Sequence, residues 1–244
     1  MLVLVNRNLK IRYKSSVLGF FWSFLSPLLL IFIYYFFLSV MRFEIDIKLL
    51  VTGVIAWQFF AMSLNDSLHA IVGNANLVTK SSFPRIILPI STVTANLVNY
   101  LLSTVILVIY LMISGADFSN LYWYPIVLLT NYALCLGMAL ILSTANVFYR
   151  DVEHILSVVL LAWFFVTPVM YPLAQLTSKF STTLQYLYFL NPMAGIVTGY
   201  HVSFLSAPVP DFRMLAISFV IAWGIFALGV AVFEKSQGKF GDEL

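Results

Sequence analysis

The feature that most constrains this sequence is a series of long apolar runs that contain very few charged residues. A helix crosses the bilayer core with roughly 20 consecutive apolar residues, and lipid-exposed backbone must satisfy its own hydrogen bonds. The alternating pattern of membrane barrel strands is absent from these runs. We therefore expect an all-α integral membrane protein with six transmembrane helices, at residues 17–40, 49–72, 86–113, 124–147, 154–171 and 214–233.

Composition supports lipid as the solvent. The chain is 61% hydrophobic and 9% charged, whereas soluble domains carry about 25% charged residues. The net charge of +3 gives no basic field of the kind that binds nucleic acid. Cys135 is the single cysteine, which excludes an intramolecular disulfide and a cysteine-based zinc site. The first apolar run is longer than a signal-peptide core and lacks a cleavage site, so we expect it to remain in the membrane.

The distribution of lysine and arginine predicts the orientation, because cytoplasmic loops are enriched in these residues. We expect residues 1–244 to form a single transmembrane domain, multi-pass, with both termini in the cytoplasm. The cations that this orientation places inside are Arg7, Lys10, Arg12, Lys14, Lys80, Arg85, Arg150, Lys235 and Lys239.

Residues 1–16 are predicted to form an amphipathic interface helix. Leu2, Val5 and Leu9 fall on one helical face, and Arg7 and Lys10 fall on the opposite one. A basic amphipathic helix lies in the plane of the membrane interface, with its cations toward anionic headgroups. Two roles fit such a helix. It can act only as an anchor that fixes the orientation of the chain in the membrane, or its cations can contact a phosphate-bearing lipid substrate.

The segment between the fifth and sixth runs differs from the rest. Its apolar stretches, residues 184–190 and 193–204, are too short to cross and are separated by Asn191 and Pro192. Re-entrant helices are tolerated at membrane depth only where protein or a water-filled cavity buries them. Two short gate helices within residues 172–211, or a loop lying on the bilayer surface, both fit this pattern.

Motifs for catalysis are missing from the sequence. It contains no Gly-x-x-x-x-Gly-Lys-Ser/Thr phosphate loop and no His-Glu-x-x-His metal motif. We therefore expect neither an enzyme nor a bound metal or cofactor. Asp66 and His69 stand three positions apart and would share a helical face; ionisable residues in membranes are functional candidates, although a structural polar contact explains Asp66 equally well.

Two polar loops are expected on the cytoplasmic side. Residues 74–85 contain Pro84, which disfavours helix at Phe83, so a short helix ending near Ser82 is expected. The loop at residues 146–154 concentrates Arg150, Asp151 and Glu153 in a tight turn. Its charges can form a local ion pair of little energetic weight, or they can contact a cytoplasmic partner.

Five motifs in order resemble the permease subunits of type-2 ABC exporters for polysaccharide, the group that handles O-antigen, capsule and teichoic acid. The resemblance covers essentially the whole chain. Its motifs are Arg12-Tyr13-Lys14-Ser15-Ser16-Val17-Leu18-Gly19 followed by Trp22 and Pro27; Phe83-Pro84-Arg85 with Leu88-Pro89; Asn146-Val147-Phe148-Tyr149-Arg150-Asp151; Pro168-Val169-Met170-Tyr171-Pro172; and Leu190-Asn191-Pro192.

The resemblance implies a homodimer in the bacterial inner membrane with two copies of a cytoplasmic ABC ATPase, which would bind ATP and Mg²⁺. The pair would export a lipid-linked polysaccharide. Arg7, Lys10, Arg12 and Lys14 would meet the lipid phosphate as it enters. The ATPase-coupling residues would be Asn76, Leu77, Val78, Lys80, Ser82, Phe83, Pro84 and Arg85, and the gate residues Tyr171, Pro172, Asn191 and Pro192.

Other functions remain open on the residues alone. A type-2 permease for a drug or a small lipid shares the six-span plan. An ion-coupled carrier or channel would need no ATPase, but such carriers usually bury more acids and bases than this sequence offers. A membrane enzyme would need a nucleophile, a base or a metal set that the sequence lacks.

Overall fold

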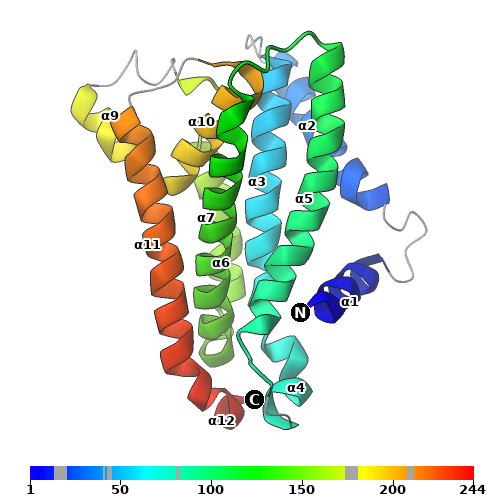
Figure 1. Ribbon diagram of the computed structural model, residues 1–244, viewed down its shortest axis with the longest axis vertical. Helices are drawn as coiled ribbons and strands as arrows, with labels where there is room; N and C mark the ends of the chain where they lie inside the picture. Colours follow the sequence, from blue (N-terminus) through cyan, green and yellow to red (C-terminus); the bar gives the residue numbers. More distant parts are fainter. Residues whose placement is uncertain (14–20, 41, 43–45, 81–82, 174–180, 208–211) are drawn as a thin grey trace.

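The computed structural model describes residues 1–13, 21–40, 42, 46–80, 83–173, 181–207 and 212–244. Within these ranges it is helical and contains no strand. Figure 1 shows long helices running side by side, with short helices at both ends of the bundle. The helices are α1 Leu2–Tyr13, α2 Trp22–Val40, α3 Ile47–Leu68, α4 Ala75–Lys80, α5 Ile87–Ile113, α6 Tyr124–Phe148, α7 Val152–Val166, α9 Thr182–Tyr188, α10 Pro192–Leu205, α11 Phe212–Ser236 and α12 Phe240–Glu243, with short 3₁₀ turns η2 Val72–Asn74, η3 Leu121–Trp123 and η4 Gln237–Lys239.

The long helices α3, α5, α6 and α11 coincide with four of the expected spans. They are the four helices in the described part of the chain that are long and apolar enough to cross a membrane. The backbone groups in the interior of such a helix are hydrogen-bonded within the segment, which is why lipid favours this form. The expectation of a helical membrane protein is therefore confirmed.

The other two apolar helices are α2 and α7, and residues 17–20 of the first expected span lie outside the described residues. α2 is described from Trp22 onward and has 19 residues, and α7 has 15 residues and ends at Val166 rather than at residue 171. α7 ends early because the chain leaves helical geometry at Thr167, whose φ is −94° and ψ 142°, one residue before Pro168.

α9 and α10 occupy the segment where two short apolar helices were expected, at one end of the bundle (Figure 1). Asn191 caps α10, because its side-chain oxygen accepts a hydrogen bond from the Met193 amide at 3.0 Å. Pro192 then occupies the first helical position, where its missing N–H costs nothing. Thirteen of the fourteen residues of α10, Pro192 to Phe204, are buried, so this helix lies inside the protein.

α6 and α11 approach each other closely through two glycines. A Cβ on Gly229 would lie 2.4 Å from the carbonyl oxygen of Gly137, and a Cβ on Gly137 would lie 2.6 Å from the Cα of Phe226. Small residues that allow such close approach are how membrane helices gain contact, since lipid supplies no hydrophobic drive between them. These two positions therefore fix how α6 and α11 pack.

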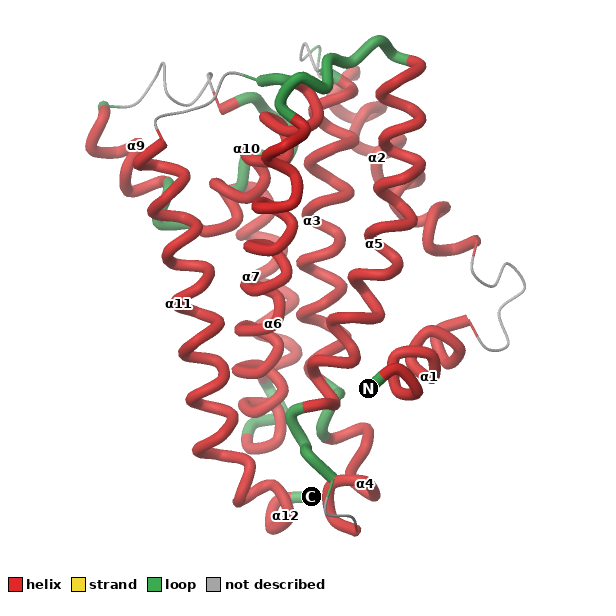
Figure 2. Tube along the Cα trace, viewed as in Figure 1, coloured by secondary structure: helices red, strands yellow, loops and turns green. Residues whose placement is uncertain are grey.

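The buried apolar residues form a large core along the spans and a smaller cluster at the end that carries α4 and α12 (Figure 2). We call the smaller one the α4-end cluster. It draws its residues from the ends of several helices, which are thereby held together. Its buried members are Ile71, Val78, Leu88, Leu140, Phe233 and Phe240.

Candidate functional site

The first candidate element is α1, which lies beside the lower part of α5 (Figure 1). Val5 is buried and Lys10 is exposed, as the expected amphipathic pattern requires. Arg7, however, is half-buried, and its Nη2 donates a hydrogen bond of 2.7 Å to Asn74 Oδ1, just before α4. Arg7 is thus engaged within the chain, whereas Lys10 is open to a ligand. The backbone of Arg12 belongs to α1, and Lys14 lies outside the described residues.

The second element is α4, within the loop expected to meet an ATPase. Its side chains divide between two faces: Asn76 and Thr79 are exposed, whereas Val78 is buried in the α4-end cluster and Leu77 packs against it. α4 therefore has an apolar side that anchors it and a polar side that is free to contact another protein. Lys80 is its last residue, and Ser82 lies outside the described residues.

Phe83, Pro84 and Arg85 follow α4 and lead into α5. Phe83 packs against the α4-end cluster, and Pro84 is exposed. Arg85 points inward: its Nη1 donates to the carbonyl of Gln237, and its Nη2 donates to the carbonyl of Val78 at 3.3 Å. Arg85 thus stabilises this end of the bundle instead of presenting a free cation.

The charged turn between α6 and α7 lies at the same end. Arg150, Asp151 and Glu153 are all exposed, and Glu153 Oε2 lies 3.6 Å from Nε2 of His69, which follows α3. Both side chains of this pair are 56% exposed, so their attraction contributes about 0–1 kcal/mol. The contact joins the charged turn at residues 146–154 to His69 at the end of α3, which were two separate features in the sequence.

Asp66 lies deeper in α3. Its Oδ2 accepts a hydrogen bond of 2.8 Å from Nδ2 of Asn96 in α5. A carboxylate held by an amide across two helices is a polar link between spans. The structure therefore gives Asp66 a structural contact, one of the two interpretations that the sequence allowed.

Asn191 is the centre of a junction at the opposite end. Its Oδ1 accepts from Trp163 Nε1 at 2.7 Å, and its Nδ2 donates to Thr167 Oγ1 at 3.1 Å. Ser218 Oγ of α11 donates to the carbonyl of Phe189 at 2.7 Å and lies 3.3 Å from that of Asn191. We call these contacts the Asn191 junction. They join α7, α10 and α11 through one short segment of chain.

Tyr171 lies near this junction and pairs with α9. Its hydroxyl lies 3.3 Å from that of Tyr188 and also 3.3 Å from the carbonyl of Phe165. Burial raises the pKa of both phenols, so both remain neutral hydroxyls. Pro172 is exposed, and residues 174–180 and 208–211 of the expected gate region lie outside the described residues.

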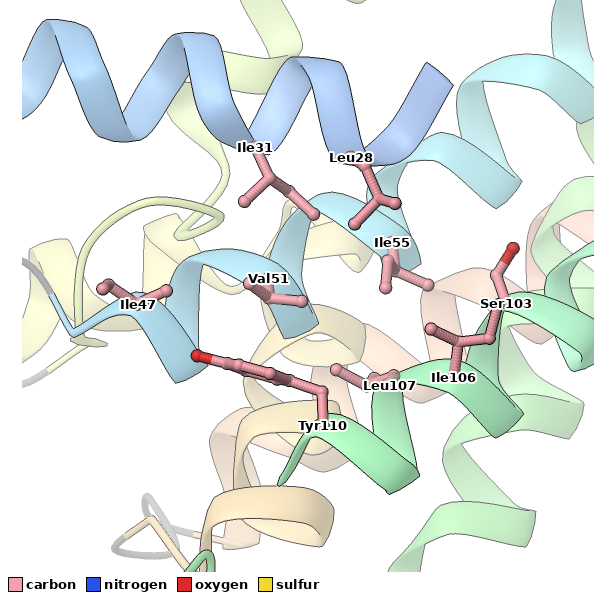
Figure 3. Close-up of a pocket in the computed structure, with 9 residues that line it drawn as sticks. All are labelled: Leu28, Ile31, Ile47, Val51, Ile55, Ser103, Ile106, Leu107 and Tyr110. Atoms are coloured by element: carbon pink, nitrogen blue, oxygen red, sulfur yellow. The ribbon is translucent and has the colours of Figure 1, made fainter. Parts of the chain in front are cut away.

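An apolar cavity of about 370 Å³ lies between α2, α3 and α5 (Figure 3). Apart from Ser103 and Tyr110 its lining is aliphatic, and the Ser103 hydroxyl already donates to the carbonyl of Asn99 at 3.1 Å. A sugar needs many hydrogen-bonding partners, which this lining does not supply. The cavity therefore suits hydrocarbon and not a glycan. Its lining residues are Leu28, Ile31, Ile47, Val51, Ile55, Ser103, Ile106, Leu107 and Tyr110.

No cluster of three or more His, Cys, Asp or Glu side chains that could hold a metal occurs in the described part of the chain. Cys135 is buried, and its sulfur lies 3.7 Å from Asn131 Oδ1 in the same helix.

Comparison with known proteins identifies the family. Residues 1–205 match the family described as ABC-2 type transporter, which takes in everything from α1 to the end of α10. The chain belongs to the ABC-2 type transporter family. This ABC-2 protein is thus a transport permease and not a catalytic enzyme.

Curated relatives extend the similarity to the whole permease. This chain is 32% identical to an O-antigen export system permease protein RfbA of Klebsiella pneumoniae over 249 aligned residues, covering 100% of this chain and 94% of the relative. A second protein of that name from the same organism is 31% identical over the same shares. One from Myxococcus xanthus is 34% identical, covering 99% of this chain and 94% of its own length.

Several residues that organise these elements were not expected from the sequence. Trp163 and Ser218 sit inside apolar runs, where nothing marks one polar atom as a link to another helix. Phe240 lies in a short polar tail that carries no signal of burial. Asn74 could have been suspected, because an asparagine before a short helix often bonds to neighbouring groups.

Proposed function

We propose that this chain is the membrane-spanning permease of an ATP-driven exporter that carries a lipid-linked, O-antigen-like polysaccharide across the bacterial inner membrane. The observation that carries the proposal is the similarity, over essentially the full chain, to three O-antigen export permeases. The permease works as a homodimer with two copies of a cytoplasmic ABC ATPase, and ATP and Mg²⁺ bind to that partner.

In this proposal α2 and α7 complete a set of six spans with α3, α5, α6 and α11. α2 has 19 residues and is about 28 Å long at 1.5 Å per residue, close to the thickness of the bilayer core. The α4 end faces the cytoplasm, because Arg85, Arg150 and Lys235 lie there and cytoplasmic loops are enriched in such cations. Both termini are then cytoplasmic.

The homodimer is supported by the apolar faces of α2 and α7. Phe32 and Phe36 of α2 are 65% and 61% exposed, and Val158 and Phe165 of α7 are 68% and 57% exposed. Lipid alone can cover such faces, but a second copy also fits them. The substrate passes between the two copies.

α4 acts as the coupling helix. Its exposed residues Asn76 and Thr79, with Pro84 beside them, contact the ATPase, while Val78 and Arg85 hold the helix in place. The charged turn at Arg150, Asp151 and Glu153 lies at the same end and widens this contact surface.

The segment from Tyr171 to the end of α10 forms the extracytoplasmic gate. The Asn191 junction supports this role, because it is the point at which α7, α10 and α11 are bonded together. A rotation of one helix at such a point changes the position of the other two, which is how rigid elements transmit a switch.

The test is co-purification of the chain with its candidate ATPase, followed by ATP hydrolysis with and without a lipid-linked glycan. We expect a stable complex whose hydrolysis rises when the glycan is added. A complex stimulated only by small amphipathic drugs or lipids would identify the second kind of exporter, for which the apolar cavity beside α2 is suited. A chain that binds no ATPase and conducts ions would contradict both.

The α1 cations are proposed to contact the lipid phosphate. Arg7 is hydrogen-bonded within the chain whereas Lys10 is exposed, so the two can be tested separately. Lys10→Gln removes an exposed cation that has no hydrogen bond to another described residue, so we expect slower export with an unchanged melting temperature. Arg7→Gln also breaks the bond to Asn74, so it should impair export and lower the melting temperature.

The measurements for these variants are export in cells and thermal unfolding of the purified complex, with Lys239→Gln as an exposed control cation at the same end. Normal export by Lys10→Gln and by a variant in which all four cations, Arg7, Lys10, Arg12 and Lys14, are glutamine would disprove phosphate recognition by α1.

A further inference from the structure

The last segment of the described chain turns back beneath the bundle and packs against α4. After α11 ends at Ser236, η4 and α12 bring Phe240 into the α4-end cluster, where it is fully buried with Val78 of α4. Its ring lies edge-on to that of Phe233 in α11, with centroids 5.4 Å apart and an interplanar angle of 80°. Phe240 therefore contacts the cluster that holds α4 and also the end of α11.

Arg85 closes the same contact with hydrogen bonds. One guanidinium group donates both to the carbonyl of Gln237 in η4 and to the carbonyl of Val78 in the last turn of α4. Carbonyls at helix ends lack partners within the helix, and an arginine there satisfies them and interacts favourably with the helix dipole. A Cβ on Gly241 would lie 3.9 Å from Nη2 of Arg85, so the segment passes directly beside this side chain.

α11 connects this contact to the far end of the protein. It has 25 residues, packs tightly on α6 through Gly229, and near its start carries Ser218, which bonds to the carbonyls of Phe189 and Asn191. One continuous helix therefore links the α4-end cluster to the Asn191 junction. In Figure 1 it runs from α12 to the level of α9 and α10.

We propose that residues 237–244 form a clamp that fixes α4 to α11, so that movement of α4 by a docked ATPase is passed along α11 to the Asn191 junction. We call this segment the C-terminal clamp. Phe240 and Arg85 are its positioning residues. The inference rests on the proposed function, since it assigns a route for the movement that the ATPase would impose on α4.

The physical reason for a clamp is the size of α4. A helix of six residues is far below the roughly 12–15 residues needed for stability in isolation. Its position therefore depends on tertiary contacts, and those of Val78 with the α4-end cluster and with Arg85 supply them. Without the clamp, a docked ATPase would displace α4 alone instead of moving α4 and α11 together.

The experiment compares Phe240→Ala and Arg85→Gln with Glu243→Gln, an exposed change in the same segment. Each variant is purified with the ATPase, and amide hydrogen exchange is measured across the chain. We expect exchange at residues 75–80 to become about tenfold faster in both clamp variants, while amides in the middle of α6 stay protected. Glu243→Gln should match the unmodified chain.

A second readout separates positioning from folding. We expect both clamp variants to bind the ATPase and hydrolyse ATP, but to lose most glycan stimulation and export. Phe240→Leu, which keeps an apolar side chain in the cluster, should restore most export. Arg85→Lys, which keeps the charge but not the two-pronged donor, should restore less.

The outcomes distinguish a failure of the clamp from a failure of the proposed function. If the unmodified chain binds no ATPase, the proposed function fails. If it binds one and responds to glycan, but the clamp variants show unchanged exchange at α4 and normal export, the clamp is disproved while the function stands. Faster exchange everywhere in Phe240→Ala would indicate unfolding, and Arg85→Gln, which removes no buried ring, then decides the question.

Discussion

Replacing Gly229 by alanine is expected to destabilise the permease strongly, although the change adds a single methyl group. The new Cβ would lie 2.4 Å from the carbonyl oxygen of Gly137 and 2.8 Å from its Cα. These are backbone atoms, so they cannot rotate away as a flexible side chain would. α11 would have to move away from α6, and the packing along both helices would loosen.

We expect the free energy of unfolding to fall by about 1–3 kcal/mol, the usual cost of overpacking. For a chain of this size that corresponds to roughly 2–12 °C in melting temperature. Thermal unfolding of the purified protein in detergent or nanodiscs measures the shift. Gly137→Ala should behave similarly, because its Cβ would lie 2.6 Å from the Cα of Phe226.

Gly224→Ala provides the matched control. Gly224 lies in the same helix, and a Cβ there meets nothing within 4 Å. We therefore expect no loss of stability from this change. Equal melting temperatures for the Gly224 and Gly229 variants would contradict the close packing of α6 and α11.

The second large effect is expected at Asn191. Asn191→Ala removes the acceptor for the Trp163 indole N–H and for the Met193 amide, and it removes the donor to Thr167 Oγ1. Loss of a helix cap costs about 1 kcal/mol, and each buried group left unpaired costs about 1–3 kcal/mol. We expect export to be lost, because α7 is no longer bonded to the start of α10, although the bonds of Ser218 in α11 to the backbone carbonyls of Phe189 and Asn191 remain.

A double-mutant cycle with Trp163→Phe tests the junction directly. If the bond between the Trp163 indole N–H and Asn191 matters, the two changes should be non-additive in melting free energy by about 0.5–3 kcal/mol. Asn65→Ala is the control, since Asn65 is exposed and its amide donates to the carbonyl of Ala61 in its own helix. Full additivity, with export retained by Asn191→Ala, would rule out a role for the junction in gating.

The spans were predictable because hydropathy alone marks them. α5 begins one residue later than expected and ends at Ile113 as expected, and α6 begins at Tyr124 as expected. The start of α10 was also readable, since Asn191-Pro192 combines a cap residue with a favoured first position. The start of α10 was therefore anticipated, whereas the end of α7 at Val166, two residues before Pro168, was missed.

Side-chain partners were not predictable in the same way. The helical pattern placed Arg7 on a polar face, but it could not reveal that Asn74 would lie within 2.7 Å of it. Arg85 looked like a contact for another protein, yet it bonds to the carbonyls of Val78 and Gln237. Such pairings depend on how segments that are distant in the sequence pack together, and this packing cannot be read from a single sequence.

The burial of Phe240 against α4 has a consequence for biosynthesis. Phe240 follows Val78 by 162 positions, and ribosomes add about 5–20 residues per second. Roughly 8–30 seconds therefore pass between the synthesis of α4 and the arrival of the ring that completes its cluster. During that interval α4 lacks its final support. If α4 contacts the ATPase as proposed, the spans would enter the membrane before that contact surface is complete, and assembly with the ATPase would follow insertion of α11.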